Sequence, residues 1–495
     1  MLPRKSILYL GLISAISVSI YLLFANQIAG IGFPLDDAWI HQTYAKNLAS
    51  GYGWSFVSGE PSAGLTAPLW GLLLAVGHYI RIGPYLLTFL LGWITLWALA
   101  VTGSYGFLIL VPGREKWAFF AGALLALEWH LVWAAVSGME TLQYALLVII
   151  VLVLLLKNDK ENKNDQSLLI GILIGVSIWV RPEGLTLLGP LLFVNLLNTY
   201  AWKKTIKRLS FSLLGFSSVF IPYLWFNQWL AGDWWPNTFF AKQAEYAVLK
   251  QLPLWTRLFQ QFSLPMVGVG ILLLPGFIYL LFQIIKKKKW SVLAMFLWFI
   301  GHLSIYAIRL PVTYQHGRYA IPSMSVYYLL AFSGFALIFD AKAKTMVTRI
   351  INKSWFLSIV LITNAFLFIG GNSYAQDVQV INSQMVHVAN WVSENIPEDN
   401  RVAAHDIGAL GYFANRPILD LAGLISPDVI PIIRDEEELA KYLNENDANY
   451  IISFPSWYPQ LIAEKFIVFQ AEIPQNPDIA EERMTVYCWK CSINP

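Results

Sequence analysis

Apolar runs recur along the chain, and most approach the roughly 20 residues that a helix needs to cross lipid. They cover residues 6–26, 68–82, 85–110, 117–136, 139–156, 167–181, 184–200, 210–231, 263–285, 291–310, 320–339 and 355–371. Only 13% of the 495 residues are charged, against about 25% in soluble domains. This excludes a soluble or disordered chain, and a net charge of +3 offers no basic surface for nucleic acid. We expect a polytopic α-helical membrane protein with about 11–13 transmembrane helices, beginning with a retained signal anchor.

The charges divide the chain into two parts. Residues 1–371 carry 27 Lys and Arg against 13 Asp and Glu, a net charge of +14. Residues 372–495 carry 7 against 18, a net charge of −11. In this second part, helix-like spacing of apolar residues (383–395, 436–446) alternates with strand-like spacing (401–404, 417–421, 450–454, 466–469). We therefore expect a transmembrane module over residues 1–371 and a soluble α/β domain over residues 372–495.

The two cysteines, Cys488 and Cys491, lie near the end of the chain. Redox motifs with this spacing open a helix after a strand. Here the pair ends a strand-like stretch instead. This argues against a redox site and leaves a structural disulfide or two free thiols.

Basic residues indicate the orientation in the membrane. They concentrate in residues 157–163, 203–208, 286–289 and 342–353, whereas the alternate loops carry fewer. The positive-inside rule puts these segments in the cytoplasm. We therefore expect a multi-pass cell-membrane protein with a cytoplasmic N-terminus and an extracytoplasmic α/β domain. Residues 68–110 read most easily as two spans, but they must cross an odd number of times, so we expect a re-entrant or half-spanning helix there.

The first external loop, residues 27–67, contains two adjacent carboxylates, Asp36 and Asp37. Apolar residues then recur every four positions, at Ile40, Tyr44 and Leu48. This pattern predicts a short helix that lies along the interface with its apolar face in lipid and its positive end beside the carboxylates. A helix cap needs only one carboxylate. The pair therefore indicates a functional site.

Further charged residues occupy loops on the same predicted side of the membrane. They are Glu60, Glu140, Arg181, Glu183, Lys242, His316 and Arg318. Charges at membrane depth are costly and usually functional, so we expect a charged cavity open to that side. Its cations would bind a lipid-linked phosphate and stabilise it as a leaving group, while a carboxylate takes a proton from an incoming hydroxyl. The sequence shows no Gly-rich phosphate loop, metal-site motif or Ser/His/Asp order.

Several motifs together resemble the GT-C glycosyltransferases, integral membrane enzymes that use polyprenyl-phosphate sugars. The motifs are Asp36-Asp37-Ala38-Trp39-Ile40, Tyr44-Ala45-Lys46-Asn47-Leu48, Gly51-Tyr52-Gly53-Trp54-Ser55-Phe56, Gly59-Glu60-Pro61, Ser137-Gly138-Met139-Glu140-Thr141, Arg181-Pro182-Glu183-Gly184, Pro236-Asn237-Thr238, His316-Gly317-Arg318-Tyr319 and Asp420-Leu421-Ala422-Gly423-Leu424. The set is similar to bacterial arabinofuranosyltransferases and, more loosely, to aminoarabinose transferases and protein O-mannosyltransferases. The latter two carry a charged residue before a Pro-Pro-Leu, where this chain has Thr66-Ala67-Pro68-Leu69, so their sugar specificity does not transfer.

The resemblance implies a role for each candidate residue. Asp36 would be the catalytic base, with Asp37 supporting it or orienting the acceptor. Glu140 would be a second acidic position, and Arg181, Lys242 and Arg318 would contact the donor phosphate; Glu60, Glu183 and His316 complete the predicted substrate-binding set. The implied reaction is an inverting single displacement onto a hydroxyl of a glycan, lipid or protein acceptor. No cofactor or metal is required, although the carboxylate pair could hold a divalent cation.

Other interpretations stay open. A transporter or flippase for a lipid-linked or polyanionic substrate would use the same charges to line a path, but it usually shows internal repeats and broken helices near the midplane. This sequence shows no repeat, and its charges cluster on one face of the membrane. A sensor that binds ligand in the α/β domain would leave Asp36 and Asp37 unexplained. We expect Glu128 and His130 to form a polar pair between helices, and Asp406 to cap a helix rather than to act in catalysis.

Overall fold

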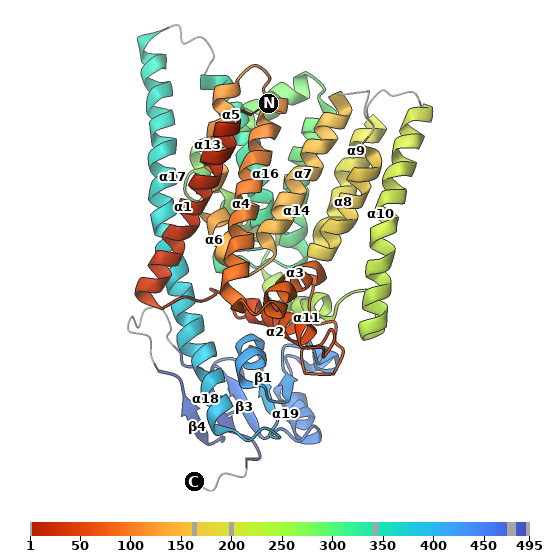
Figure 1. Cartoon of the computed structure of the whole chain (residues 1–495), viewed down its shortest axis with the longest axis vertical. Helices are drawn as coiled ribbons and strands as arrows, with labels where there is room; N and C mark the ends of the chain where they lie inside the picture. The colour runs from red at the N-terminus through yellow and green to blue at the C-terminus, as the bar shows by residue number, and fades with distance from the viewer. Residues whose placement is uncertain (1, 161–165, 198–201, 340–344, 473–481, 492–495) are drawn as a thin grey trace.

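The computed structural model describes residues 2–160, 166–197, 202–339, 345–472 and 482–491. A bundle of long apolar helices forms one end of the molecule and a small sheet domain the other (Figure 1). Two of the predicted cytoplasmic segments, 157–163 and 342–353, lie partly outside the described residues. The described helix ends beside them, in α7 and α17, lie at the end of the bundle opposite to the sheet domain.

Among the described residues, seven helices are long and apolar enough to cross a membrane. They are α1 (Arg4–Ile28), α4 (Gly83–Leu110), α7 (Thr141–Lys160), α10 (Trp202–Ala231), α14 (Trp290–Arg309), α16 (Ile321–Phe339) and α17 (Met346–Ile381). Two bent pairs raise this number to nine if each is one span: α5 (Glu115–Leu127) with α6 (Trp129–Val136), bent by 54°, and α12 (Leu254–Ser263) and η3 (Leu264–Met266) with α13 (Gly270–Lys286), bent by 103°. The polytopic helical class is confirmed. The expected number, about 11–13, also counted the shorter apolar helices α8 (Ser167–Val180) and η1–α9 (Pro182–Leu187 and Leu188–Leu197).

The region 68–110 crosses the bundle once. The helix α3 (Pro68–Tyr79) has 12 residues, about 18 Å of rise, which is too short for a hydrocarbon core of about 30 Å. It stays at the end of the bundle that carries the sheet domain, and α4 makes the full crossing (Figure 1). The simplest interpretation, two full spans, was therefore wrong, and α3 is the short helix that the topology requires.

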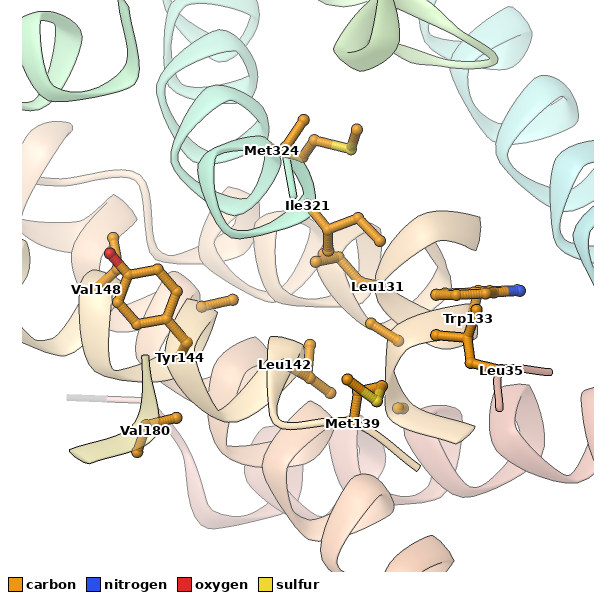
Figure 2. Packing of buried hydrophobic residues seen from close by; sticks show 14 of the residues in the cluster. Leu35, Leu131, Trp133, Met139, Leu142, Tyr144, Val148, Val180, Ile321 and Met324 are labelled. Carbon is orange, nitrogen blue, oxygen red and sulfur yellow. The ribbon is translucent and has the colours of Figure 1, made fainter. Parts of the chain in front are cut away.

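Close helix contacts hold the centre of the bundle. Side chains of α6, α7 and α16, including Leu131, Leu142 and Ile321, pack against one another there (Figure 2). A side-chain carbon on Gly92 of α4 would lie 1.8 Å from the carbonyl oxygen of Ala135 in α6, so the two backbones touch. Small residues allow such contacts in membrane helices. The contact between α4 and α6 holds the turn after α6, which carries Glu140.

The C-terminal part contains a five-stranded mixed sheet in the order β2-β1-β3-β5-β4. Its strands are β1 (Val402–Ala404), β2 (Ile418–Asp420), β3 (Tyr450–Ser453), β4 (Ile467–Gln470) and β5 (Thr485–Cys488). The helices α18 (His387–Asn395) and α19 (Glu436–Glu445) accompany it, and a disulfide joins Cys488 to Cys491. The α/β class of this part is confirmed. Residues 371 and 372 both lie inside α17, so one helix runs from the bundle to the domain.

Candidate functional site

The predicted short helix in the first loop exists as α2 (Asp37–Ala49). Gly51 follows it with a φ of +86°, a conformation that suits glycine. The expected place in lipid was wrong. Ile40 and Tyr44 are both buried, because α2 packs between α3 and the C-terminal domain. The carboxylates at its start therefore lie between the helix bundle and the sheet domain.

Asp37 sits in a cluster of cations. Its Oδ2 lies 2.5 Å from Nη1 of Arg318 and 4.0 Å from Nζ of Lys242. Lys242 projects from α11 (Asn237–Glu245), and Arg318 lies in the turn before α16. Burial opposes ionisation of Asp37, but the charges of Lys242 and Arg318 outweigh it and hold its pKa well below the usual range. Asp37 is therefore ionised at neutral pH.

Asp36 has a different environment, although it is the adjacent residue. Its Oδ2 and Oδ1 accept hydrogen bonds from the backbone N–H groups of Gly408 (2.6 Å) and Ala409 (2.8 Å). These groups begin the helical segment that continues as η5 (Leu410–Ala414). Burial raises the pKa of Asp36 to about 8, the charge of Asp406 adds to this, and the two N–H bonds oppose it. The expected cap by Asp406 was thus wrong, since Asp36 reaches across from the membrane module and fills that place.

A cavity of about 610 Å³ opens on the bundle side of Asp37; we call it the lipid-side cavity. Apolar side chains make up much of its wall, among them Leu185, Phe239, Phe240, Ile305 and Leu310. Its polar part contains six of the predicted residues: Asp37, Glu140, Arg181, Glu183, Lys242 and Arg318. Arg181 lies 3.3 Å from Glu140 and 3.4 Å from Glu183. This cavity is a long apolar space with a charged end.

The partners of Glu140 keep it charged. His41, one turn after Asp37 on α2, lies 3.2 Å from its carboxylate. Burial raises the pKa of Glu140, but the hydrogen bond from His41 and the charge of Arg181 bring it below the ordinary value. Tyr306 also donates a hydrogen bond to Glu183. The acids and bases at this end of the cavity are therefore mutually paired.

A second cavity, of about 930 Å³, lies between α2 and the C-terminal domain; we call it the domain-side cavity. Asp36, Glu245, His405, Asp406 and Trp457 are among the residues that line it. Both cavities share one set of lining residues, which we call the neck: Asp37, Ile40, Lys242, Arg318 and Leu424. The cationic cluster thus stands where the mainly apolar cavity meets the more polar one.

Two predicted substrate-binding residues line neither cavity. Glu60 is an exposed loop residue. His316 contacts Oδ2 of Asp377 at 2.8 Å, and the same oxygen accepts a hydrogen bond from the indole of Trp133. Asp377 itself lines the domain-side cavity. His316 therefore borders the site through Asp377, and Glu60 lies apart from it.

The pair Glu128 and His130 forms a buried polar cluster, as expected. The two side chains lie 2.8 Å apart, and the hydroxyl of Tyr328 donates to Glu128 at 3.1 Å. Glu128 also caps α6 through the N–H of Leu131. Neither residue lines either cavity. This cluster therefore stabilises the bend between α5 and α6.

Sequence reasoning missed several residues of the site. Glu245 follows Lys242 by one helical turn, and His41 follows Asp37 by one turn, so helical spacing was an available signal. His405 and Asp406 follow strand β1, and the carboxyl ends of parallel strands often carry ligand-binding residues. No sequence signal marked Trp457. Within the described ranges, no three His, Cys, Asp or Glu residues are grouped as a metal site.

Comparisons with known proteins place the fold. No curated protein matches the chain in sequence, and residues 372–487 match a family described as a domain of unknown function (DUF8728). ArnT from Cupriavidus metallidurans bound to undecaprenyl phosphate is 14% identical with a TM-score of 0.62, over 96% of this chain and 97% of that chain. The Archaeoglobus fulgidus oligosaccharyltransferase in complex with Zn and sulfate is 13% identical with a TM-score of 0.60, over 89% of this chain and 68% of that chain.

A third structure, AglB from Archaeoglobus fulgidus in complex with an inhibitory peptide and a dolichol-phosphate, is 12% identical with a TM-score of 0.58, over 89% of this chain and 69% of that chain. At such identities the likeness concerns the fold. The chain therefore has the fold of the GT-C membrane glycosyltransferases over nearly its whole length, which confirms the fold expected from the motifs.

Proposed function

We propose that this protein is an integral membrane glycosyltransferase (EC 2.4 class) that moves a sugar from a polyprenyl-phosphate donor to an acceptor hydroxyl on the extracytoplasmic side. The proposal rests on the residues of the neck. There, Asp37, Lys242 and Arg318 stand between a mainly apolar cavity in the bundle and a more polar cavity under the C-terminal domain. A transferase for lipid-linked sugars needs such a junction, since its two substrates differ in polarity and must meet at one point.

The donor would occupy the lipid-side cavity. Its apolar wall suits a prenyl chain, and Arg318 and Lys242 stand at its end to bind the phosphate. Arg181 would extend the cationic surface, while Glu140 and Glu183 hold it in place. The likeness to a structure that binds undecaprenyl phosphate supports this assignment. The donor sugar then lies at the neck.

Asp36 would act as the general base. It lines the domain-side cavity, from which the acceptor would approach. Two backbone N–H bonds orient its carboxylate, and each oxygen keeps a lone pair for an acceptor hydroxyl. Its raised pKa makes it a stronger base than Asp37, and a base works best when its pKa lies near the working pH.

The reaction would be a single displacement. The acceptor oxygen forms a bond to the anomeric carbon while its proton passes to Asp36. The bond from that carbon to the phosphate oxygen breaks, and polyprenyl phosphate leaves with inversion at the carbon. Arg318 and Lys242 stabilise the charge that develops on the leaving phosphate. Asp37 keeps these two cations in place and ionised. A divalent cation stays an alternative for this charge stabilisation, and transfer in the presence of EDTA tests it.

The decisive assay is sugar transfer by the purified protein. Radiolabelled polyprenyl-phosphate sugars are offered as a panel with membrane-extract acceptors, and wild type is compared with Asp36→Asn and Asp37→Asn. We expect Asp36→Asn to lose at least about 100-fold in rate, the usual contribution of a general base. Both variants should still bind donor.

Three results would change the proposal. Transfer kept in Asp36→Asn but lost in Asp37→Asn would move the base to Asp37. Transfer from no donor, with donor binding that Asp36→Asn leaves intact, would favour a transporter or flippase. Labelling of acceptors on the cytoplasmic side of sealed vesicles would contradict the proposed orientation.

A further inference from the structure

An exposed tryptophan lies in the domain-side cavity, away from the neck. Trp457 stands in the loop between β3 and β4, and 42% of its surface is exposed. Its ring meets the ring of His405 edge to face at 4.7 Å and lies 5.2 Å from the ring of Phe454. Trp457 is therefore held by neighbours on one side and presents the other to the cavity. Unlike the other exposed apolar side chains of this domain, Phe466 and Ile467, this indole lines a cavity, where a ligand can stack on it.

Hydrogen-bonding groups surround this ring. His405 contacts the hydroxyl of Tyr458 at 2.7 Å through Nδ1 and Glu245 at 3.5 Å through Nε2. The carboxylate of Asp406 lines the same cavity and stands next in the chain. Asp36 lines this cavity as well, and the charge of Asp406 acts on it. One aromatic face and several carboxylates therefore line one continuous space.

This combination matches a sugar better than a lipid or an extended peptide. A sugar ring offers an apolar C–H face for an aromatic ring and hydroxyl pairs for carboxylates and imidazoles. A lipid acceptor needs a continuous apolar wall, whereas carboxylates and the imidazole of His405 interrupt the apolar lining of the domain-side cavity. An extended peptide binds along an exposed strand edge, and among the described residues the edge strands β2 and β4 do not line this cavity.

We propose that the domain-side cavity binds a carbohydrate acceptor, stacked on Trp457 and hydrogen-bonded by Asp406 and Glu245, while His405 holds Glu245 in place. This rests on the proposed function, because it assigns the acceptor of that reaction. The acceptor chain would enter beneath the C-terminal domain and bring one hydroxyl to Asp36. The C-terminal domain then selects the acceptor, while the helix bundle binds the donor.

The test is binding of oligosaccharides to the full-length protein in lipid nanodiscs, without donor, followed by saturation-transfer NMR. The probes are hexasaccharides of arabinose, mannose, galactose and glucose, with a Ser/Thr-containing hexapeptide as the peptide arm. We expect at least one hexasaccharide to bind, Trp457→Ala to weaken it about tenfold or more, and Trp457→Phe to restore part of the affinity. Phe466→Ala is the matched control, since Phe466 is 63% exposed in the same domain and lines neither cavity.

The outcomes separate this inference from the proposed function. Binding that Trp457→Ala leaves unchanged, or binding of the peptide alone, overturns the carbohydrate site even if transfer occurs. Oligosaccharide binding that depends on Trp457, in a protein that transfers no sugar, keeps the site and overturns the transferase. Loss of binding in Phe466→Ala as well would show a general loss of structure, and Trp457→Phe then decides. Affinity that is at least partly kept in Trp457→Phe supports the site, and no binding in this variant overturns it.

Discussion

The two cavities differ in almost every property, yet they meet at adjacent residues. The lipid-side cavity has apolar walls and a charged end in which acids and bases are paired. The domain-side cavity is lined by carboxylates, His405 and an exposed Trp457. Asp37 belongs to both, whereas Asp36 belongs to the second alone. A change of one residue along the chain thus moves a carboxylate from one environment to the other.

Two identical, adjacent side chains can therefore take two roles. Burial and the neighbouring Asp406 raise the pKa of Asp36, while Lys242 and Arg318 hold the pKa of Asp37 low. Titratable neighbours whose pKa values are pushed apart are a usual sign of separate acid–base and electrostatic roles. We therefore expect changes around the two carboxylates to have different effects.

The largest effect on sugar transfer is expected at the contact between Asp36 and the C-terminal domain. Gly408→Ala would put a carbon 2.1 Å from the carbonyl oxygen of Asp36 and 2.7 Å from its carboxylate. The contact must open, so we expect transfer to fall about 100-fold or more, as after loss of the base, while donor binding stays unchanged. Gly301→Ala is the control, because open space surrounds Gly301. Equal transfer in both variants would break the assignment of Asp36.

A smaller effect, on donor affinity, is expected from a change of Arg318 in the neck. Arg318→Gln removes a charged hydrogen bond to Asp37 and a phosphate contact, and charged hydrogen bonds contribute about 1.5–3 kcal/mol. We expect donor affinity to fall about ten- to hundredfold and Arg318→Lys to keep part of it. Acceptor binding should not change. A donor titration monitored by thermal shift measures this, and a loss confined to the acceptor would reverse the roles of the two cavities.

The pH dependence of the transfer rate also distinguishes the two carboxylates. The base must be deprotonated, and the pKa of Asp36 is raised to about 8. The rate below that pH should therefore rise about tenfold per pH unit and level off above it. Asp406→Asn removes a charge that raises this pKa, so the rising limb should move to lower pH. A profile that is flat between pH 6 and 8 in wild type argues for Asp37 as the base, since it is already ionised there.

The smallest effect is expected at Glu60. This residue is exposed and lines neither cavity. Glu60→Gln should change transfer by less than about twofold, the range of ordinary surface substitutions. Initial rates at several acceptor concentrations measure it. A loss as large as that expected for Arg318→Gln would return Glu60 to the substrate-binding set.

The sequence predicted the features that depend on nearby residues. Apolar runs indicated the helix bundle, spacing indicated α2, and two adjacent carboxylates marked the site. Contacts between residues far apart in the sequence could not be predicted. Asp36 bonds the backbone of Gly408 across 372 positions, and nothing near either residue signals that pairing. For the same reason, the sequence could not show that the domain covers α2, and it placed this helix in lipid.

The division of the two substrates at the neck is the central claim. A structure of the protein with a bound polyprenyl phosphate tests it most directly. The account predicts the phosphate beside Arg318 and Lys242, with the prenyl chain along the apolar wall of the lipid-side cavity. A phosphate bound in the domain-side cavity, beside His405 and Arg434 in its lining, would contradict it.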